Sequence, residues 1–132
     1  MRKQLLLIES RTDIRQQLRA SLETEDVDIL ECADAATAEI LARSCRPDAV
    51  VLDRFMPGPV DGMELCRRIK ADPSLWRTKI LMLGGNQFED IVIDLADGAD
   101  EYLPEACPAH HVQQQLSAWL EDVPETILDI SL

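Results

Sequence analysis

Short apolar runs alternate along this chain with longer segments of helical periodicity, and this alternation constrains the fold more than any other feature. The apolar runs lie at 4–8, 27–31, 48–53, 79–85 and 101–103. The third run contains an uninterrupted Ala-Val-Val-Leu stretch, which is typical of a strand buried on both faces. Helical segments after each run would cover the two faces of a parallel sheet. We therefore predict an α/β fold with five strands and five helices.

The helical segments are recognised by apolar residues three or four positions apart. The first spans 11–25 and the second 34–46, where Asp34 is a plausible N-cap. The inward positions expected for the five helices are Ile14, Leu18 and Leu22; Ala38, Leu41 and Cys45; Met63, Cys66 and Ile69; Phe88, Ile91, Val92 and Leu95; and Val112, Leu116, Trp119 and Leu120.

Length and charge bound the possible functions. The 132 residues are enough for one domain, which we place at 1–122, with 123–132 as a C-terminal tail or the start of a linker because Pro124 ends the last helix. The net charge of -12 argues against direct binding of nucleic acid or of an anionic membrane. The apolar start is too short for a signal peptide or a membrane span. Four cysteines without a CxxC pair favour a reducing, cytoplasmic setting.

Two acids are predicted to meet at one edge of the sheet. With strand order 2-1-3-4-5, the crevice for a ligand lies beyond the carboxyl ends of the first and third strands. Glu9 and Ser10 follow the first strand, and Asp53 ends the third. Two neighbouring carboxylates repel each other unless a cation lies between them, and Mg²⁺ prefers oxygen ligands. The alternative is that strand ends carry polar residues simply because they reach solvent.

Two segments resemble the receiver domain, the phosphoacceptor module of two-component response regulators. "VVLDRFMPGPVDGMEL" is similar to the family's phosphoacceptor strand and loop, and "GADEYL" to its fifth strand. The resemblance extends from residue 3 to about 121 and implies a flavodoxin-like (βα)5 three-layer sandwich with strand order 2-1-3-4-5. It implies a cytoplasmic signalling domain, not an enzyme, whose partner is a sensor histidine kinase or a phosphotransfer protein.

The resemblance also assigns roles to individual residues. Asp53 would accept the phosphoryl group. The Mg²⁺ ligands would be Glu9, Asp53 and the backbone carbonyl of Phe55, with Ser10 as a further candidate. Met56 and Pro57 would shape the loop, which is one residue longer than usual, and Gly62 would begin the third helix.

The chain departs from the family pattern at three places. Ser10 replaces a second acid, which implies weak Mg²⁺ binding. Gly84 stands where a hydroxyl residue is expected, or Leu83 does if the register slips by one, so the switch involving Tyr102 loses its trigger. Tyr102 is then expected to pack half-buried. Glu105 replaces a lysine, and its carboxylate would repel a phosphoryl group.

Arg11 and Arg54 flank the predicted crevice in sequence. One of them could supply the missing cation, and the alternative is that both are solvated surface residues. The adjacent His110 and His111 are expected at the surface.

Two functional hypotheses stay open at this point. The chain is either a receiver that accepts a phosphoryl group on Asp53 with altered switching, or a phosphorylation-independent module for protein interaction or dimerisation. In the second case the fourth helix, fifth strand and fifth helix would form the docking face. Phosphorylation of the protein but not of Asp53→Asn would separate the two.

Overall fold

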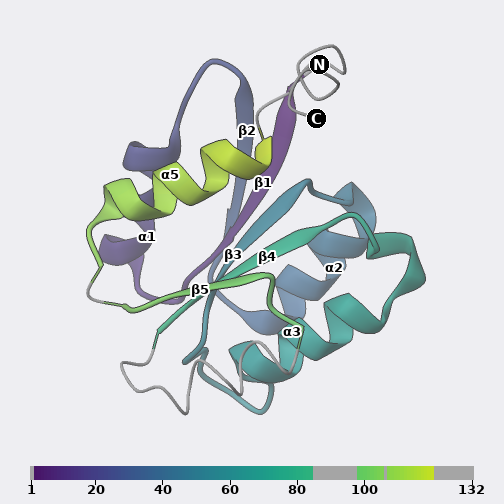
Figure 1. The fold of residues 1–132 in the computed structure, drawn as a ribbon. Coiled ribbons are helices and arrows are strands. Elements are labelled where there is room, and N and C mark those ends of the chain that lie inside the picture. The colour runs from purple at the N-terminus through teal and green to yellow at the C-terminus, as the bar shows by residue number, and fades with distance from the viewer. Residues whose placement is uncertain (1, 85–97, 106, 121–132) are drawn as a thin grey trace.

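A single five-stranded parallel sheet forms the centre of the molecule (Figure 1). The computed structural model describes residues 2–84, 98–105 and 107–120. The strand order β2-β1-β3-β4-β5 confirms the prediction. The strands are β1 (Lys3–Ile8), β2 (Val27–Cys32), β3 (Ala49–Asp53), β4 (Lys79–Leu83) and β5 (Glu101–Leu103).

Helices cover both faces of this sheet, as Figure 1 shows. The described helices are α1 (Thr12–Leu22), α2 (Ala35–Cys45), α3 (Gly62–Ala71) and α5 (Ala109–Leu120). A short 3-10 helix, η1 (Pro73–Leu75), was not predicted; Asp72 caps it through the Ser74 amide. The predicted fourth helix and the 123–132 tail lie outside the described residues. Among the described helices, none is long and apolar enough to cross a membrane.

Alternation along the strands divides the core into two layers. Leu5 and Leu7 of β1 pack with α1 and α5, whereas Leu6 and Ile8 pack with α2 and α3. This follows from the two-residue period of a strand, which sends successive side chains to opposite faces. Every residue of β3 is buried, as predicted for a central strand. The alternation also decides the face on which a residue just beyond a strand end will lie.

The inward faces of two helices differ slightly from the prediction. In α2 the buried residues are Ala35, Ala38 and Ala42, while Leu41 and Cys45 are only half-buried. Small residues let α2 approach the sheet closely, so its larger side chains lie at the rim of the interface. In α3, Leu65 is buried with Cys66 and Ile69, and Met63 is half-buried.

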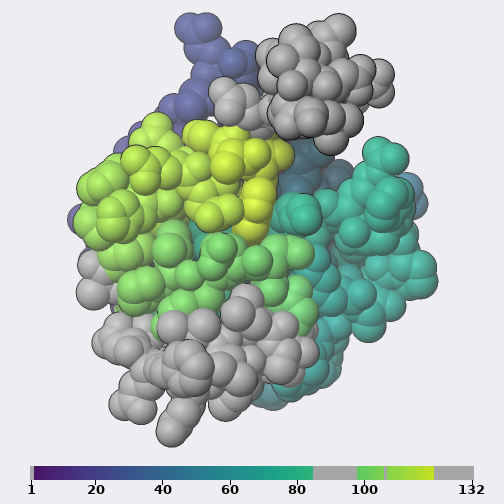
Figure 2. Space-filling model, in the orientation of Figure 1, coloured from purple at the N-terminus to yellow at the C-terminus, as the bar shows by residue number. Residues whose placement is uncertain are grey.

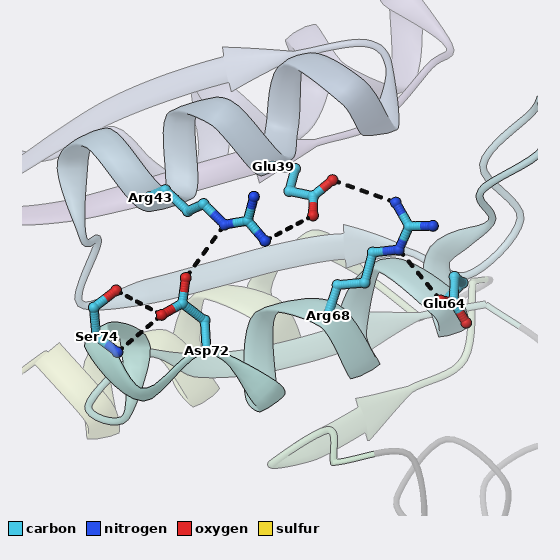
Figure 3. Close-up of polar contacts among 6 residues, drawn as sticks. All are labelled: Glu39, Arg43, Glu64, Arg68, Asp72 and Ser74. Carbon is cyan, nitrogen blue, oxygen red and sulfur yellow. Dashed lines mark hydrogen bonds and ion pairs between the residues drawn. The ribbon is translucent and has the colours of Figure 1, made fainter.

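Ion pairs connect the outer surfaces of α2 and α3. Glu39 accepts from Arg43 of its own helix at 3.0 Å and from Arg68 of α3 at 3.4 Å (Figure 3). Arg43 also reaches Asp72, which caps η1 through Ser74. The network therefore connects α2 with both elements that follow β3.

The fifth strand is short, and an ion pair just before its start joins it to the third helix. Lys70 of α3 contacts Asp100 at 2.6 Å, and the same Asp100 oxygen accepts from the Ile80 amide. Figure 2 shows the residues around β5 (green) between α5 (yellow-green) and α3 (teal). Tyr102 of β5 is only 6% exposed and packs with the α2 and α3 layer, so it is more buried than predicted.

Candidate functional site

The strand alternation brings two carboxylates to the same edge and the same face of the sheet. Glu9 continues the β1 positions that face α1 and α5, and Asp53 continues the corresponding positions of β3. Both residues are buried, with exposed fractions of 2% for Glu9 and 6% for Asp53. The two acids thus meet at the predicted crevice, where burial of charge is costly unless it is compensated.

Backbone contacts fix the position of Glu9. Its amide donates to the Cys32 carbonyl at 3.1 Å, and its carbonyl accepts from Arg15 Nη1 at 2.8 Å. Arg15 also pairs with Glu31 at the end of β2. The role of Arg15 was not anticipated from the sequence, because the contact depends on how α1 lies across the end of β1.

The environment of Glu9 favours its protonated form. Burial and the neighbouring Asp53 carboxylate raise the pKa of Glu9 to about 7, although Arg11 opposes both effects. Glu9 Oε1 accepts from Arg11, but Glu9 Oε2 is buried without a hydrogen-bond partner among the described residues. A buried oxygen of this kind calls for a proton or a cation.

Arg11 is the basic residue at the mouth of the crevice. Its Nε and Nη2 lie 2.7 and 2.6 Å from Glu9 Oε1, and its Nη1 contacts Glu105 Oε1. One guanidinium therefore connects the loop after β1 with the loop after β5. Sequence reasoning named Arg11 as a candidate cation but did not predict that it would join Glu9 to Glu105.

The loop after β3 is shaped around the Asp53 side chain. The Phe55 amide donates to Asp53 Oδ1 at 3.0 Å, and Met56 is buried while Pro57 is exposed. Gly62 begins α3, as predicted, and its amide donates to the Arg54 carbonyl. A Cβ at Gly62 would lie 2.2 Å from the Asp53 carbonyl oxygen, so only glycine allows this approach.

The positions that depart from the family pattern lie at different places around the site. Leu83 lines the crevice, and Gly84 follows β4 at a φ of +133° against Arg54 and Phe55. Ser10 is half-buried and does not line the crevice. Glu105 lies at the mouth.

The crevice continues inward as a cavity of about 140 Å³ between the sheet, α1 and α5. Its inner wall is largely apolar, and burial raises the pKa of the Cys107 thiol in that wall. His110 and His111 are exposed, as predicted. The cavity is lined by Ile8, Glu9, Arg11, Ile14, Gln17, Leu18, Val51, Asp53, Leu83, Glu105, Cys107 and Ala109.

The two buried carboxylates suit a hard divalent cation. None of the residues that the structure describes donates to Glu9 Oε2, and Asp53 lies beside it. Within the part of the chain that the structure describes, no group of three His, Cys, Asp or Glu side chains is placed to hold a metal. Mg²⁺ keeps several waters and is commonly bound by one or two carboxylates, so the donor set fits this ion.

Comparison with known families decides what kind of domain carries this site. The family described as the response regulator receiver domain matches residues 5–117. This chain belongs to that family. It is a receiver domain of the two-component response regulators, and domains of this family generally bind Mg²⁺ at their acidic pocket.

Individual relatives agree with this assignment. The chain is 39% identical over 99 residues to the transcriptional regulatory protein AfsQ1 of Streptomyces coelicolor, covering 75% of this chain and 43% of that protein. It is 28% identical to the DNA-binding response regulator MtrA of Mycolicibacterium smegmatis, covering 98% of this chain and 57% of MtrA. The chain thus spans about half the length of these relatives.

Solved structures show the same fold. The signal receiver domain of a DNA-binding response regulator (merR) from Colwellia psychrerythraea superposes with a TM-score of 0.84 at 23% identity. The match covers 91% of this chain and 99% of that one. The flavodoxin-like prediction is therefore confirmed.

Proposed function

We propose that this receiver domain accepts a phosphoryl group on Asp53, with Mg²⁺ held by Glu9, Asp53 and the Phe55 carbonyl. Ser10 remains a further candidate ligand through water. The observation that carries the proposal is the buried Glu9–Asp53 pair, in which no described residue donates to Glu9 Oε2. A cation would satisfy this oxygen and reduce the repulsion between the two acids.

The protein contributes to phosphoryl transfer mainly by positioning the reacting carboxylate and by neutralising charge. A carboxylate oxygen of Asp53 attacks the phosphorus of a phosphohistidine or an acyl phosphate. The bond from phosphorus to the leaving nitrogen or oxygen breaks, and the leaving group takes its electron pair. The Phe55 amide at 3.0 Å keeps the Asp53 carboxylate in one orientation. Bound Mg²⁺ would supply charge neutralisation at the phosphoryl oxygens.

Phosphoryl transfer should be slower, and Mg²⁺ binding weaker, than at a site that has a second acid in place of Ser10. Arg11 already occupies Glu9 Oε1, and a Glu9 pKa near 7 means that protons compete with the metal. Neither Leu83 nor Gly84 can donate a side-chain hydrogen bond to a phosphoryl oxygen. Glu105 brings a carboxylate to the mouth of the crevice.

The partner and the setting follow from this proposal. The phosphodonor would be a sensor histidine kinase or a phosphotransfer protein, and the domain would act in the cytoplasm as a signalling module, not as an enzyme. All four cysteines are free, which suits a reducing compartment. We assign the receiver to 1–122 and the tail or linker to 123–132. The net charge of -12 supports a domain that does not itself bind nucleic acid.

Phosphorylation with a small acyl phosphate tests the proposal. The purified chain is incubated with acetyl phosphate and Mg²⁺, and intact mass is measured before and after treatment with hydroxylamine, which cleaves acyl phosphates. We expect one labile phosphoryl group on the wild type and none on Asp53→Asn. Asp26→Asn, which changes an exposed carboxylate, is the control and should be labelled normally. A wild-type protein that stays unlabelled at saturating Mg²⁺ would refute the proposal.

The second candidate is a phosphorylation-independent interaction module. It is favoured by the Arg11 bridge, because Glu9 and Glu105 already share a cation before any ligand binds. In that case the domain would dock or dimerise through the face of the fourth helix, β5 and α5, of which the fourth helix lies outside the described residues. Sedimentation of wild type and Asp53→Asn with and without acetyl phosphate separates the candidates. An association state that is the same in wild type and Asp53→Asn, and that acetyl phosphate does not change, would support the interaction module.

A further inference from the structure

We propose that Arg11 is the residue that binds the phosphoryl group at Asp53, and that Glu105 holds its guanidinium in place until that group arrives. This inference rests on the proposed function and names a phosphoryl-binding residue for it. A dianionic group at Asp53 would enter a crevice already lined by Glu9 and Glu105. Among the residues that line this crevice in the described chain, Arg11 is the basic one.

The guanidinium can bind a further anion without leaving its position. It presents five N–H donors, and its contacts with Glu9 and Glu105 use each of its three nitrogens once. One proton on each terminal nitrogen remains for further acceptors. A guanidinium fork matches the spacing of two oxygens on one phosphoryl group.

Arg11 stands at a position where the helix itself would prefer another residue. It is the N-cap of α1 and makes no side-chain capping bond. Ser, Thr, Asp and Asn are preferred at an N-cap, and a positive charge at a helix N-terminus opposes the helix dipole. An unfavourable local choice of this kind is expected at functional sites. The side chain instead turns to Glu9 and Glu105.

The second candidate cation from the sequence lies elsewhere. The Arg54 guanidinium is 5.1 Å from the centroid of the Phe55 ring, and Phe55 is about half exposed. Arg54 does not line the crevice. The two arginines therefore make a matched pair for substitution.

The Arg11 contacts predict opposite effects on metal and on phosphoryl binding. At alkaline pH, where Glu9 is ionised with or without Arg11, removing the guanidinium would free Glu9 Oε1 and leave the carboxylate pair more negative, so Mg²⁺ should bind more tightly. The same change would remove the cation that faces the phosphoryl oxygens, so their binding should weaken. A residue that only neutralises or positions Glu9 would not separate the two ligands in this way.

The test uses Mg²⁺ and beryllofluoride, a phosphoryl mimic, as separate probes. At one alkaline pH, affinities are measured by calorimetry or Trp fluorescence on wild type, Arg11→Gln, Arg11→Lys, Arg54→Gln and Glu105→Gln, with Mg²⁺ saturating when beryllofluoride is titrated. We expect Arg11→Gln to bind beryllofluoride at least about tenfold more weakly and Mg²⁺ a few fold more tightly, since a charged hydrogen bond of ordinary strength is worth at least that factor. Arg11→Lys should keep only part of the affinity, since it retains the charge but not the fork. Arg54→Gln should match wild type, and Glu105→Gln should bind beryllofluoride more tightly.

Each other outcome would count against the inference. Unchanged beryllofluoride binding in Arg11→Gln would overturn it, as would parallel loss of both ligands, which would make Arg11 a positioning residue for Glu9. Loss of affinity in Arg54→Gln alone would assign the cation to Arg54. Mg²⁺ binding by Arg11→Gln also reports that the variant is folded. A wild type that binds Mg²⁺ but neither beryllofluoride nor a phosphoryl group would overturn the proposed function and this inference together.

Discussion

Gly62 is a residue whose missing side chain fixes the position of Asp53. A Cβ there would lie 2.2 Å from the Asp53 carbonyl oxygen and 2.7 Å from the Arg54 Cα, which are backbone atoms that cannot turn aside. We expect Gly62→Ala to displace the end of β3, to lower stability by about 1–3 kcal/mol and to slow phosphorylation. Urea unfolding and acetyl phosphate labelling measure the two effects.

Gly58 gives the matched control for this substitution. Its φ is +96°, but a Cβ there would meet nothing within 4 Å. Gly58→Ala should therefore cost only the backbone strain of about 1–2 kcal/mol and leave labelling unchanged. Equal labelling rates in the two variants would show that the close approach at Gly62 does not position Asp53.

The raised pKa of Glu9 gives the stability a defined pH dependence. The folded state keeps a proton on Glu9 up to pH about 7, whereas the unfolded chain loses it near 4.5. Stability from this group is therefore fully present below about pH 4.5 and is lost as pH rises to 7, by up to about 3 kcal/mol. We expect Glu9→Gln to flatten the slope of unfolding free energy between pH 5 and 7, measured in urea.

Three acids with lowered pKa values do not affect the slope of the unfolding free energy in this pH range. Hydrogen bonds hold the pKa of Asp34, Glu64 and Asp72 below their ordinary values, so their contributions change below about pH 4.5 and have the opposite sign. The same slope in wild type and Glu9→Gln would mean that Glu9 is ionised in the folded protein throughout.

The site residues differ in how far the sequence could reveal them. Glu9 and Asp53 were predictable because each directly follows an apolar strand, and parallel strands end at one edge. The contact of Arg11 with Glu105 was not, because it joins two loops whose side-chain directions depend on the packing of α1 and α5. The contact of Arg15 with the Glu9 carbonyl could not be predicted for the same reason.

At the scale of elements, the strands were predicted more accurately than the helix faces. Strand runs are short and continuous, so the order and approximate bounds followed from the pattern. In α2 the three buried residues are alanines, and alanine is a weak signal of burial beside Leu41 and Cys45. The helix η1 depends on a capping bond in which the Ser74 amide donates to the Asp72 carboxylate, and hydrophobic periodicity does not report such a bond.

The ion pairs between α2 and α3 should contribute a small, salt-sensitive share of stability. Glu39 accepts from Arg43 and Arg68 together, and the three side chains range from 19% to 56% exposed (Figure 3). We expect Glu39→Gln to lower the unfolding free energy by about 0.5–1 kcal/mol at low salt and by less in about 0.5 M NaCl, where screening of the ion pairs is stronger. A loss that is independent of salt would indicate a packing role for Glu39.

Glu23→Gln is a suitable control for this element. Glu23 is an exposed acid beyond α1, outside the network of Figure 3, and its removal changes the net charge by the same amount. Its unfolding free energy should stay within about 0.5 kcal/mol of wild type.

For the whole molecule, the net charge of -12 opposes the compact state, whereas the ion pairs support it. Added NaCl screens both, but it acts most on repulsion between distant exposed charges and least on short contacts and buried pairs. The excess of 25 acidic over 13 basic residues is large for a chain of 14.8 kDa. Screening of the general repulsion should therefore prevail, and the melting temperature of the wild type should rise with NaCl.

Comparing Mg²⁺ with NaCl at equal ionic strength separates this general screening from binding at the site. Screening by either salt should stabilise wild type, Glu9→Gln and Asp53→Asn alike. Mg²⁺ should raise the melting temperature further only where both carboxylates are present, since a ligand that binds the folded state alone stabilises it. That further rise should be larger at pH 8 than at pH 5.5, because a Glu9 pKa near 7 makes protons compete with the metal at the lower pH. Thermal unfolding of the three proteins would refute the assignment of the metal to Glu9 and Asp53 if all gained equally from Mg²⁺.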